Sequence, residues 1–114
     1  MAADPLEPYL RHYRELAAQV GEIGWCAVGS VVERYTYCGK PGCRCQADPP
    51  QPHGPYYQLT RKIAAKTVTR RLSPDEAASY KQWVANDHRL RQIVAEIEQV
   101  SAQAIEIILL SRRS

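Results

Sequence analysis

The chain has 114 residues, of which 45% are hydrophobic and 24% are charged, and its formal net charge is +3. This length predicts one domain with a modest core. The sequence has no apolar run of 18 residues and no signal-peptide pattern, so we expect a soluble, cytoplasmic protein without a membrane partner. In that reducing compartment, clustered cysteines are more typical of metal or redox sites than of structural disulfides.

The first predicted element is an amphipathic helix over residues 1–22. Asp4, Pro5 and Glu7 form a typical helix start, because a carboxylate caps the first turn, proline follows it and glutamate closes a capping box. Apolar residues then recur three and four positions apart along one face, and Gly21 is typical of a helix end. The apolar face of this helix needs a partner.

The middle of the chain, residues 27–72, is predicted to form a small antiparallel sheet. Segment 27–37 is rich in β-branched and aromatic residues, and segments 56–63 and 66–72 alternate in side-chain character. The last two segments are joined by two alanines, which is short enough for a hairpin. Gly29 marks a bulge or a close approach of two backbones. The alternation gives the three-stranded sheet one mostly apolar face and one polar, basic face.

The last predicted element is a long helix over residues 73–110, which completes an α+β fold. Ser73 and Glu76 form a capping box at its start, and neither glycine nor proline follows Pro74. We expect this helix to extend beyond the sheet that it covers, with a bend near residues 86–87.

An apolar seam with heptad spacing runs along the long helix and predicts a homodimer. A helix longer than the sheet leaves apolar surface exposed, and a second copy is the simplest way to bury it. The alternative is an intramolecular hairpin with the first helix. The seam residues are Leu90, Ile93, Ile97, Val100, Ala104 and Ile107.

The loop between the first two strands, within residues 38–57, is the most unusual part of the chain. Its many prolines and glycines leave few apolar side chains with which to fold, so we expect a metal ion to hold its shape. Three thiolates and one imidazole make a closed, structural zinc site. Cys43 and Cys45 would face the ion from one side of an extended segment. The candidate ligands, in the pattern C-x4-C-x-C-x7-H, are Cys38, Cys43, Cys45 and His53.

Two alternatives to a zinc site stay open at this point. One is a proline-braced loop with reduced thiols. The other is a redox or iron–sulfur site, which the absence of a C-x-x-C pair disfavours. The fourth cysteine, Cys26, follows Trp25 and is expected to be a buried thiol outside the site.

Positive charge is concentrated in the middle of the chain. Residues 33–72 carry eight basic and two acidic residues, whereas the rest of the chain carries seven basic and ten acidic residues. This segregation favours a polyanionic partner, nucleic acid first and DNA before RNA, although solvated strand faces are the alternative. Tyr56 would either stack on an unpaired base or pack in the core. The basic candidates for phosphate contact are Lys40, Arg44, Arg61, Lys62, Lys66, Arg70 and Arg71.

Two motifs carry a family resemblance. Cys-Gly-Lys-Pro-Gly-Cys-Arg-Cys at residues 38–45, followed by His-Gly-Pro-Tyr-Tyr at residues 53–57, resembles an uncharacterised bacterial family found near transposase and other mobile-element genes. The resemblance runs from about Gly29 to Ile108. It implies a genomic neighbourhood and no activity. It leads us to expect an accessory protein of a mobile element or phage, with a transposase or recombinase as a further partner.

No catalytic set stands out in the sequence. There is no paired-carboxylate motif and no glycine-rich phosphate loop, so we expect a protein that is not an enzyme. The hypothesis that we favour is a DNA-binding protein. One rival is a protein-interaction adaptor that recruits a transposase or recombinase through its helices, and another is a small metal or redox enzyme.

Overall fold

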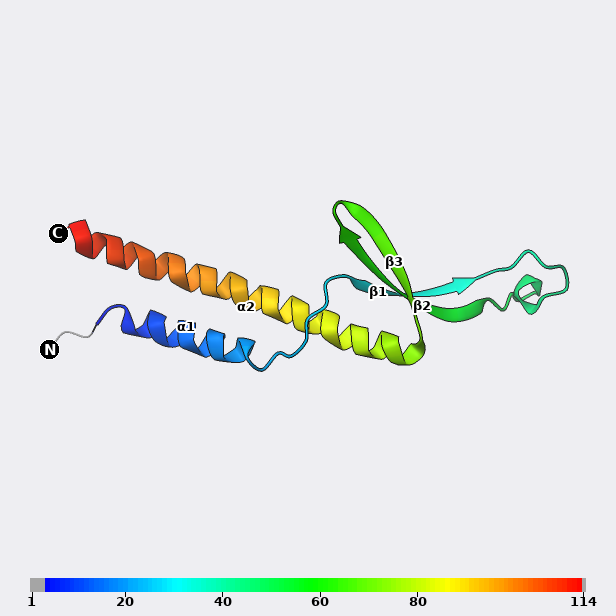
Figure 1. The fold of residues 1–114 in the computed structure, drawn as a ribbon, viewed down its shortest axis with the longest axis horizontal. Coiled ribbons are helices and arrows are strands. Elements are labelled where there is room, and N and C mark those ends of the chain that lie inside the picture. The colour runs from blue at the N-terminus through cyan, green and yellow to red at the C-terminus, as the bar shows by residue number, and fades with distance from the viewer. Residues whose placement is uncertain (1–3, 114) are drawn as a thin grey trace. The chain divides into compact units, whose positions relative to one another are not determined.

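A computed structural model describes residues 4–113. Within these residues, one α-helix precedes and one follows three strands in sequence order (Figure 1), and the predicted α+β architecture is confirmed. The elements in order are α1 (Glu7–Val20), β1 (Ser30–Thr36), the short 3₁₀ helix η1 (Arg44–Gln46), β2 (His53–Ile63), β3 (Lys66–Leu72) and α2 (Pro74–Arg113). Among the described residues, no helix is long and apolar enough to cross a membrane.

The chain forms two compact units by its internal contacts, and the single domain stays a prediction. Among the described residues, one unit is formed by residues 4–26 together with residues 85–113, and the other is Ala27–Val84. Helix α2 contributes its first part to the second unit and its remainder to the first. Each unit has its own cluster of buried apolar side chains.

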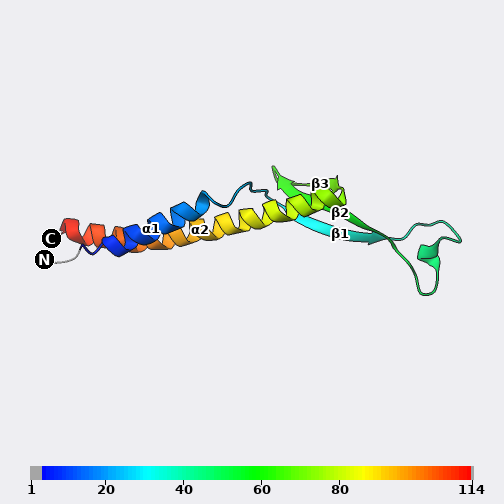
Figure 2. The same cartoon turned by 90° about the horizontal axis from the view of Figure 1, so that it is seen from below.

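In the helical unit, α1 lies along α2 (Figure 2), and Leu16 of α1 packs with Ile93 and Val100 of α2. The first turn differs from its prediction. The helix begins at Glu7 with Leu6 in the capping position, and the Asp4 carboxylate accepts a hydrogen bond from the Leu6 N–H at 2.9 Å. The carboxylate therefore orders the turn before the helix and does not cap the helix itself.

The predicted dimer seam is partly buried by the chain's own first helix. Ile93 is 0% exposed and Val100 is 6% exposed, and the partly buried Ile97 packs against the cluster that these two residues form with Leu16 of α1. The intramolecular hairpin, which was the alternative for these three residues, therefore accounts for their burial. Leu90, Ala104 and Ile107 are only partly buried. Dimerisation stays a prediction.

Helix α2 continues without interruption through the predicted bend. Asn86 donates a side-chain hydrogen bond to the Trp25 carbonyl at 2.8 Å, and Asp87 accepts one from Arg91 at 2.8 Å. Both polar side chains are therefore bonded without breaking the helix. At its start, the predicted capping box is confirmed, because Ser73 and Glu76 exchange hydrogen bonds of 3.0 and 3.2 Å.

The three strands form an antiparallel sheet in the order β1-β2-β3. Leu59 pairs with Val31 on one side and with Arg70 on the other, so these three residues share a face. On that face, Leu59 and Leu72 are buried with two residues from the first part of α2. We call it the covered face. The opposite face carries Tyr56, Gln58 and their cross-strand partners, and we call it the open face.

Two strand starts differ from their predictions. Strand β1 begins at Ser30 and not at residue 27, because the Ala27 N–H donates to the Trp83 carbonyl at 3.0 Å instead of joining the ladder. Strand β2 begins at His53, three residues early. Cys26 therefore lies on an irregular connection before β1, where it is exposed and not buried as predicted.

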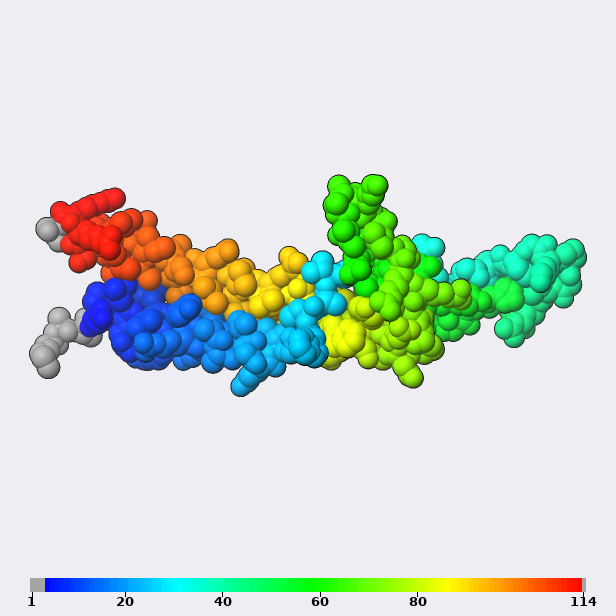
Figure 3. Space-filling view, in the orientation of Figure 1, coloured from blue at the N-terminus to red at the C-terminus, as the bar shows by residue number. Residues whose placement is uncertain are grey.

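The β2–β3 hairpin projects from the sheet (Figure 3), and its turn has an uncommon backbone. Ala64 has φ 50° and Ala65 has φ 67°, which is the left-handed region that costs an L-residue about 1 kcal/mol or more. We expect Ala65→Gly to raise the free energy of unfolding by about 0.5–1 kcal/mol. Chemical denaturation measures the change. Ala102→Gly, an exposed site inside α2, serves as the control and should lower stability by about 1 kcal/mol. A loss of stability in both variants would contradict the turn conformation.

Candidate metal centre

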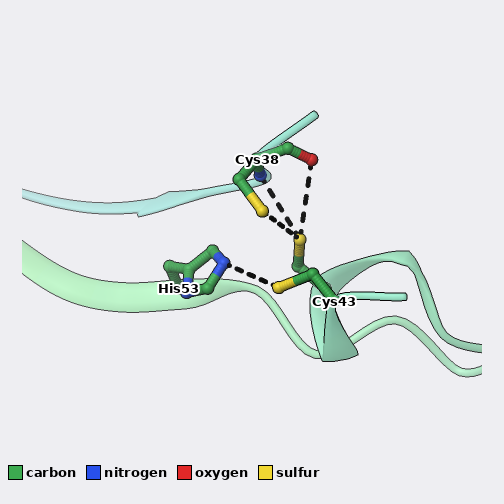
Figure 4. A group of neighbouring side chains, drawn as sticks. Cys38, Cys43 and His53 are labelled. Carbon is green, nitrogen blue, oxygen red and sulfur yellow. Dashed lines mark hydrogen bonds between the residues drawn. The ribbon is translucent and has the colours of Figure 1, made fainter. Parts of the chain in front are cut away.

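The four predicted ligands come together at one end of the sheet, and Figure 4 labels three of them, Cys38, Cys43 and His53. Cys38 follows β1, His53 begins β2, and Cys43 and Cys45 lie at the start of η1. One ligand atom from each of the four residues lies within 4.8 Å of all the others. Segments up to 15 positions apart in sequence thus supply a single cluster of three sulfurs and one imidazole nitrogen.

The spacing within the cluster fits a small tetrahedral cation. The Cys38 and Cys45 sulfurs are 3.4 Å apart, and the Cys43 sulfur is 3.2 Å from the His53 Nε2 atom. A disulfide would need about 2.05 Å, so the thiols are not bonded to one another. Four ligands at about 2.0–2.3 Å from one ion would be roughly 3.5–3.8 Å apart. Small side-chain adjustments would therefore complete such a shell.

Backbone hydrogen bonds shape the segment that carries two of the thiols. The Cys43 N–H donates to the Lys40 carbonyl at 3.3 Å, and the Gln46 N–H donates to the Cys43 carbonyl at 2.9 Å. Cys45 therefore lies in a 3₁₀ turn, and the prediction of an extended segment is wrong. The turn still brings Cys45 to the cluster, where it is 2% exposed. The Gln46 side chain donates to the Cys38 carbonyl and closes the loop further.

Hydrogen bonding within the cluster gives two of its thiols different pKa values. Burial raises the pKa of Cys45, but hydrogen bonds from the Cys38 backbone and from the side chains of Cys38, Cys43 and His53 outweigh it and lower this pKa to about 6. For Cys38, a backbone hydrogen bond from Lys40 lowers the pKa, yet hydrogen bonds with the Cys43 and Cys45 side chains raise it overall. Cys45 is thus mostly a thiolate at neutral pH, which is the form that binds metals.

The sheet fixes the position of His53, the candidate imidazole ligand. His53 pairs with Thr36 across the β1–β2 ladder. The next residue, Gly54, has φ 132°, and a side-chain carbon there would lie 2.7 Å from the Arg34 carbonyl oxygen. Only glycine allows the two strands to approach so closely beside the ligand.

Comparison with known proteins gives a family and no activity. A family model described as "Domain of unknown function (DUF6788)" matches residues 6–82, which is most of the chain. The chain belongs to this family. The expected membership of an uncharacterised family is thereby confirmed, while the mobile-element setting stays a prediction. No curated protein and no solved structure matches the DUF6788 chain. The matched region includes α1, the whole sheet, the Cys/His loop and the first turns of α2.

In this DUF6788 chain, the basic candidates all have exposed side chains but do not share one surface. Lys40 and Arg44 lie in the Cys/His loop. The strand register divides the rest: Arg61, Lys66 and Arg70 are on the covered face, whereas Lys62 and Arg71 are on the open face with Tyr56.

Arg34 is a basic residue of β1 that we did not name as a candidate. It pairs directly with Tyr56 on the open face. The signal that would have found it is the antiparallel register between β1 and β2, which periodicity within one strand does not give.

Proposed function

We propose that the chain is a nucleic-acid-binding protein, with DNA as its target, and that structural zinc holds its Cys/His loop. The proposal rests on how few of the eight basic residues in segment 33–72 are paired with a carboxylate. Only one of them, Arg70, forms an ion pair with a carboxylate of the described chain, at 3.8 Å from Glu76. The other seven keep their charges available for phosphate groups.

Zinc is favoured by the chemistry of the donor set. Three thiolates and one imidazole are typical of structural zinc, and four protein ligands leave no open position for a substrate. Bound zinc would supply four coordinate bonds that tie residues 38 and 53 to the turn between them. Lys40 and Arg44 would then be presented from a fixed loop.

The broader role follows from the same residues and from the family resemblance of their motifs. We propose an accessory protein of a mobile element or phage that acts in the cytoplasm as a homodimer and has no catalytic activity of its own. A transposase or recombinase would be its protein partner. In a symmetric dimer, two copies would contact two half-sites.

Salt dependence tests the proposed function. With about three phosphate contacts per copy, affinity for labelled DNA should fall roughly twentyfold for a single strand and fortyfold for a duplex between about 50 and 200 mM salt. Fluorescence anisotropy with duplex and single-stranded oligonucleotides measures this change. The double variant Lys40→Ala with Arg44→Ala should reduce the slope of log affinity against log salt concentration by nearly two, because two phosphate contacts are lost.

The matched control is Arg11→Ala, which removes the same kind of charge from α1, where Arg11 lies 3.9 Å from Glu7. It should leave DNA affinity unchanged. No binding to either form of DNA at low salt would contradict the proposal and favour the adaptor alternative. Equal losses in the control and the loop variant would mean that net charge alone is responsible.

A further inference from the structure

The open face of the sheet contains a hollow that the metal site and the loop do not use. Its volume is about 280 Å³. All three strands contribute to it, and its lining residues are Arg34, Thr36, Tyr56, Gln58 and Arg71. The two arginines, the aromatic ring and the two neutral hydrogen-bonding groups are the kinds of side chain that bind a nucleotide.

The strand register explains why these side chains meet. Arg34 of β1 pairs with Tyr56 of β2, and Gln58 of β2 pairs with Arg71 of β3. Directly paired residues share a face, and residues two apart on one strand share it as well. Tyr56 is therefore flanked by an arginine from each neighbouring strand.

The two arginines have no carboxylate partner anywhere in residues 4–113. The Arg71 guanidinium lies over the Tyr56 ring, with its central carbon 4.4 Å from the ring centroid. Its neighbour Arg70, on the covered face, is instead paired with Glu76. The hollow therefore combines a positive charge on each side with an aromatic ring between them.

From this arrangement we infer that the hollow binds one nucleotide unit of single-stranded nucleic acid. This inference rests on the proposed function and narrows its ligand. The base stacks on Tyr56, while Arg34 and Arg71 contact the phosphates on either side. Stacking of a base on an aromatic ring is stronger than an exposed cation–π contact, so Arg71 can leave the ring for a phosphate.

The size of the hollow favours a single strand over a duplex. Its volume is near the lower limit of small-molecule sites, at about 300 Å³, so it can admit one base and not a base-paired helix. In a duplex, the faces of the bases are stacked on one another and cannot reach Tyr56. Gln58 and Thr36 are placed to hydrogen-bond the edge of an inserted base.

Tyr56 variants test the inference with a labelled single strand and its duplex in anisotropy titrations. Tyr56→Ala should weaken single-strand binding about tenfold and leave duplex binding unchanged. Tyr56→Phe keeps the ring and should retain single-strand affinity. Arg71→Ala should weaken single-strand binding and reduce the salt slope by about 0.7. Arg11→Ala, on α1 and outside the basic segment, is the control and should leave both affinities unchanged.

The outcomes separate this inference from the proposed function. Binding of neither oligonucleotide would overturn the proposed function itself. Tighter binding of the duplex, with no effect of Tyr56→Ala on the single strand, would overturn only the inference. Thermal unfolding of each variant shows whether the fold persists. If the alanine variant unfolds, the Arg71→Ala titrations decide, and a single-strand affinity and salt slope equal to those of the control would overturn the inference.

Discussion

Cys45→Ser is expected to abolish stoichiometric zinc binding and to lower the melting temperature of the whole chain by roughly 12–17 °C. Cys45 is the most buried of the four ligands, at 2% exposed, and it contacts Cys38 directly. A ligand that binds only the folded chain stabilises it by about 3–4 kcal/mol when its free concentration is several hundred times Kd. Loss of that term gives the expected shift. Calorimetry and zinc analysis of the purified variant measure both effects.

The control for this variant is Cys26→Ser. Cys26 is exposed, and its thiol donates a weak hydrogen bond to the Gly24 carbonyl at 3.6 Å, so zinc content and melting temperature should both stay at wild-type values. A chelator should reproduce the effect of Cys45→Ser on the wild type and have no effect on Cys45→Ser itself. Equal melting temperatures for the two serine variants would count against a structural metal.

Gly54→Ala is expected to destabilise the sheet unit by about 2–4 kcal/mol and to weaken zinc binding roughly 10- to 100-fold. The new methyl group would lie 2.7 Å from the Arg34 carbonyl oxygen, and the backbone φ of 132° is itself unfavourable for alanine. Relief of this clash must move β1 and β2 apart next to His53. A ligand that loses the groups that orient it typically binds its metal about 10- to 100-fold more weakly. Denaturation and competition with a zinc indicator measure the two changes.

Gly39→Ala provides the matched control in the same loop. A side-chain carbon at Gly39 would have no atom within 4 Å, so stability should change by less than about 0.5 kcal/mol and zinc affinity should be retained. If Gly54→Ala bound zinc as tightly as Gly39→Ala does, the close approach of the strands would not position His53.

Local signals in the sequence were enough to predict most of the fold. The capping box of Ser73 and Glu76 placed the start of α2, because its two hydrogen bonds involve neighbouring residues only. Two alanines between alternating segments located the hairpin turn. Gly29 was predicted as a bulge or close approach, and a side-chain carbon there would indeed lie 2.8 Å from the Thr60 carbonyl oxygen.

The candidate metal ligands could also be predicted, but not the geometry that unites them. Residue type identified the three cysteines and the histidine, whose ligand atoms do cluster. The 3₁₀ turn at Cys45 depends on backbone hydrogen bonds that leave no mark on side-chain periodicity. Exposure of Cys26 likewise depends on a long-range contact, the bond from Ala27 to Trp83, which delays the start of β1.

Positions that depend on pairing between distant segments could not be predicted. The heptad seam of α2 fits either a second copy or the chain's own first helix, since both bury the same apolar stripe. The structure shows Leu16 of α1 packed against Ile93. The hollow beside Tyr56 also needs a register across three strands, which brings in Arg34 from a segment more than 20 residues away.

The central claim is that a coordinated metal ion holds the loop between Cys38 and His53. The most direct test is the zinc-to-protein ratio of the chain purified without added metal, measured by elemental analysis alongside native mass spectrometry. We predict one zinc ion per chain. A folded protein that carries no zinc, with masses equal to that of the bare chain, would contradict the account.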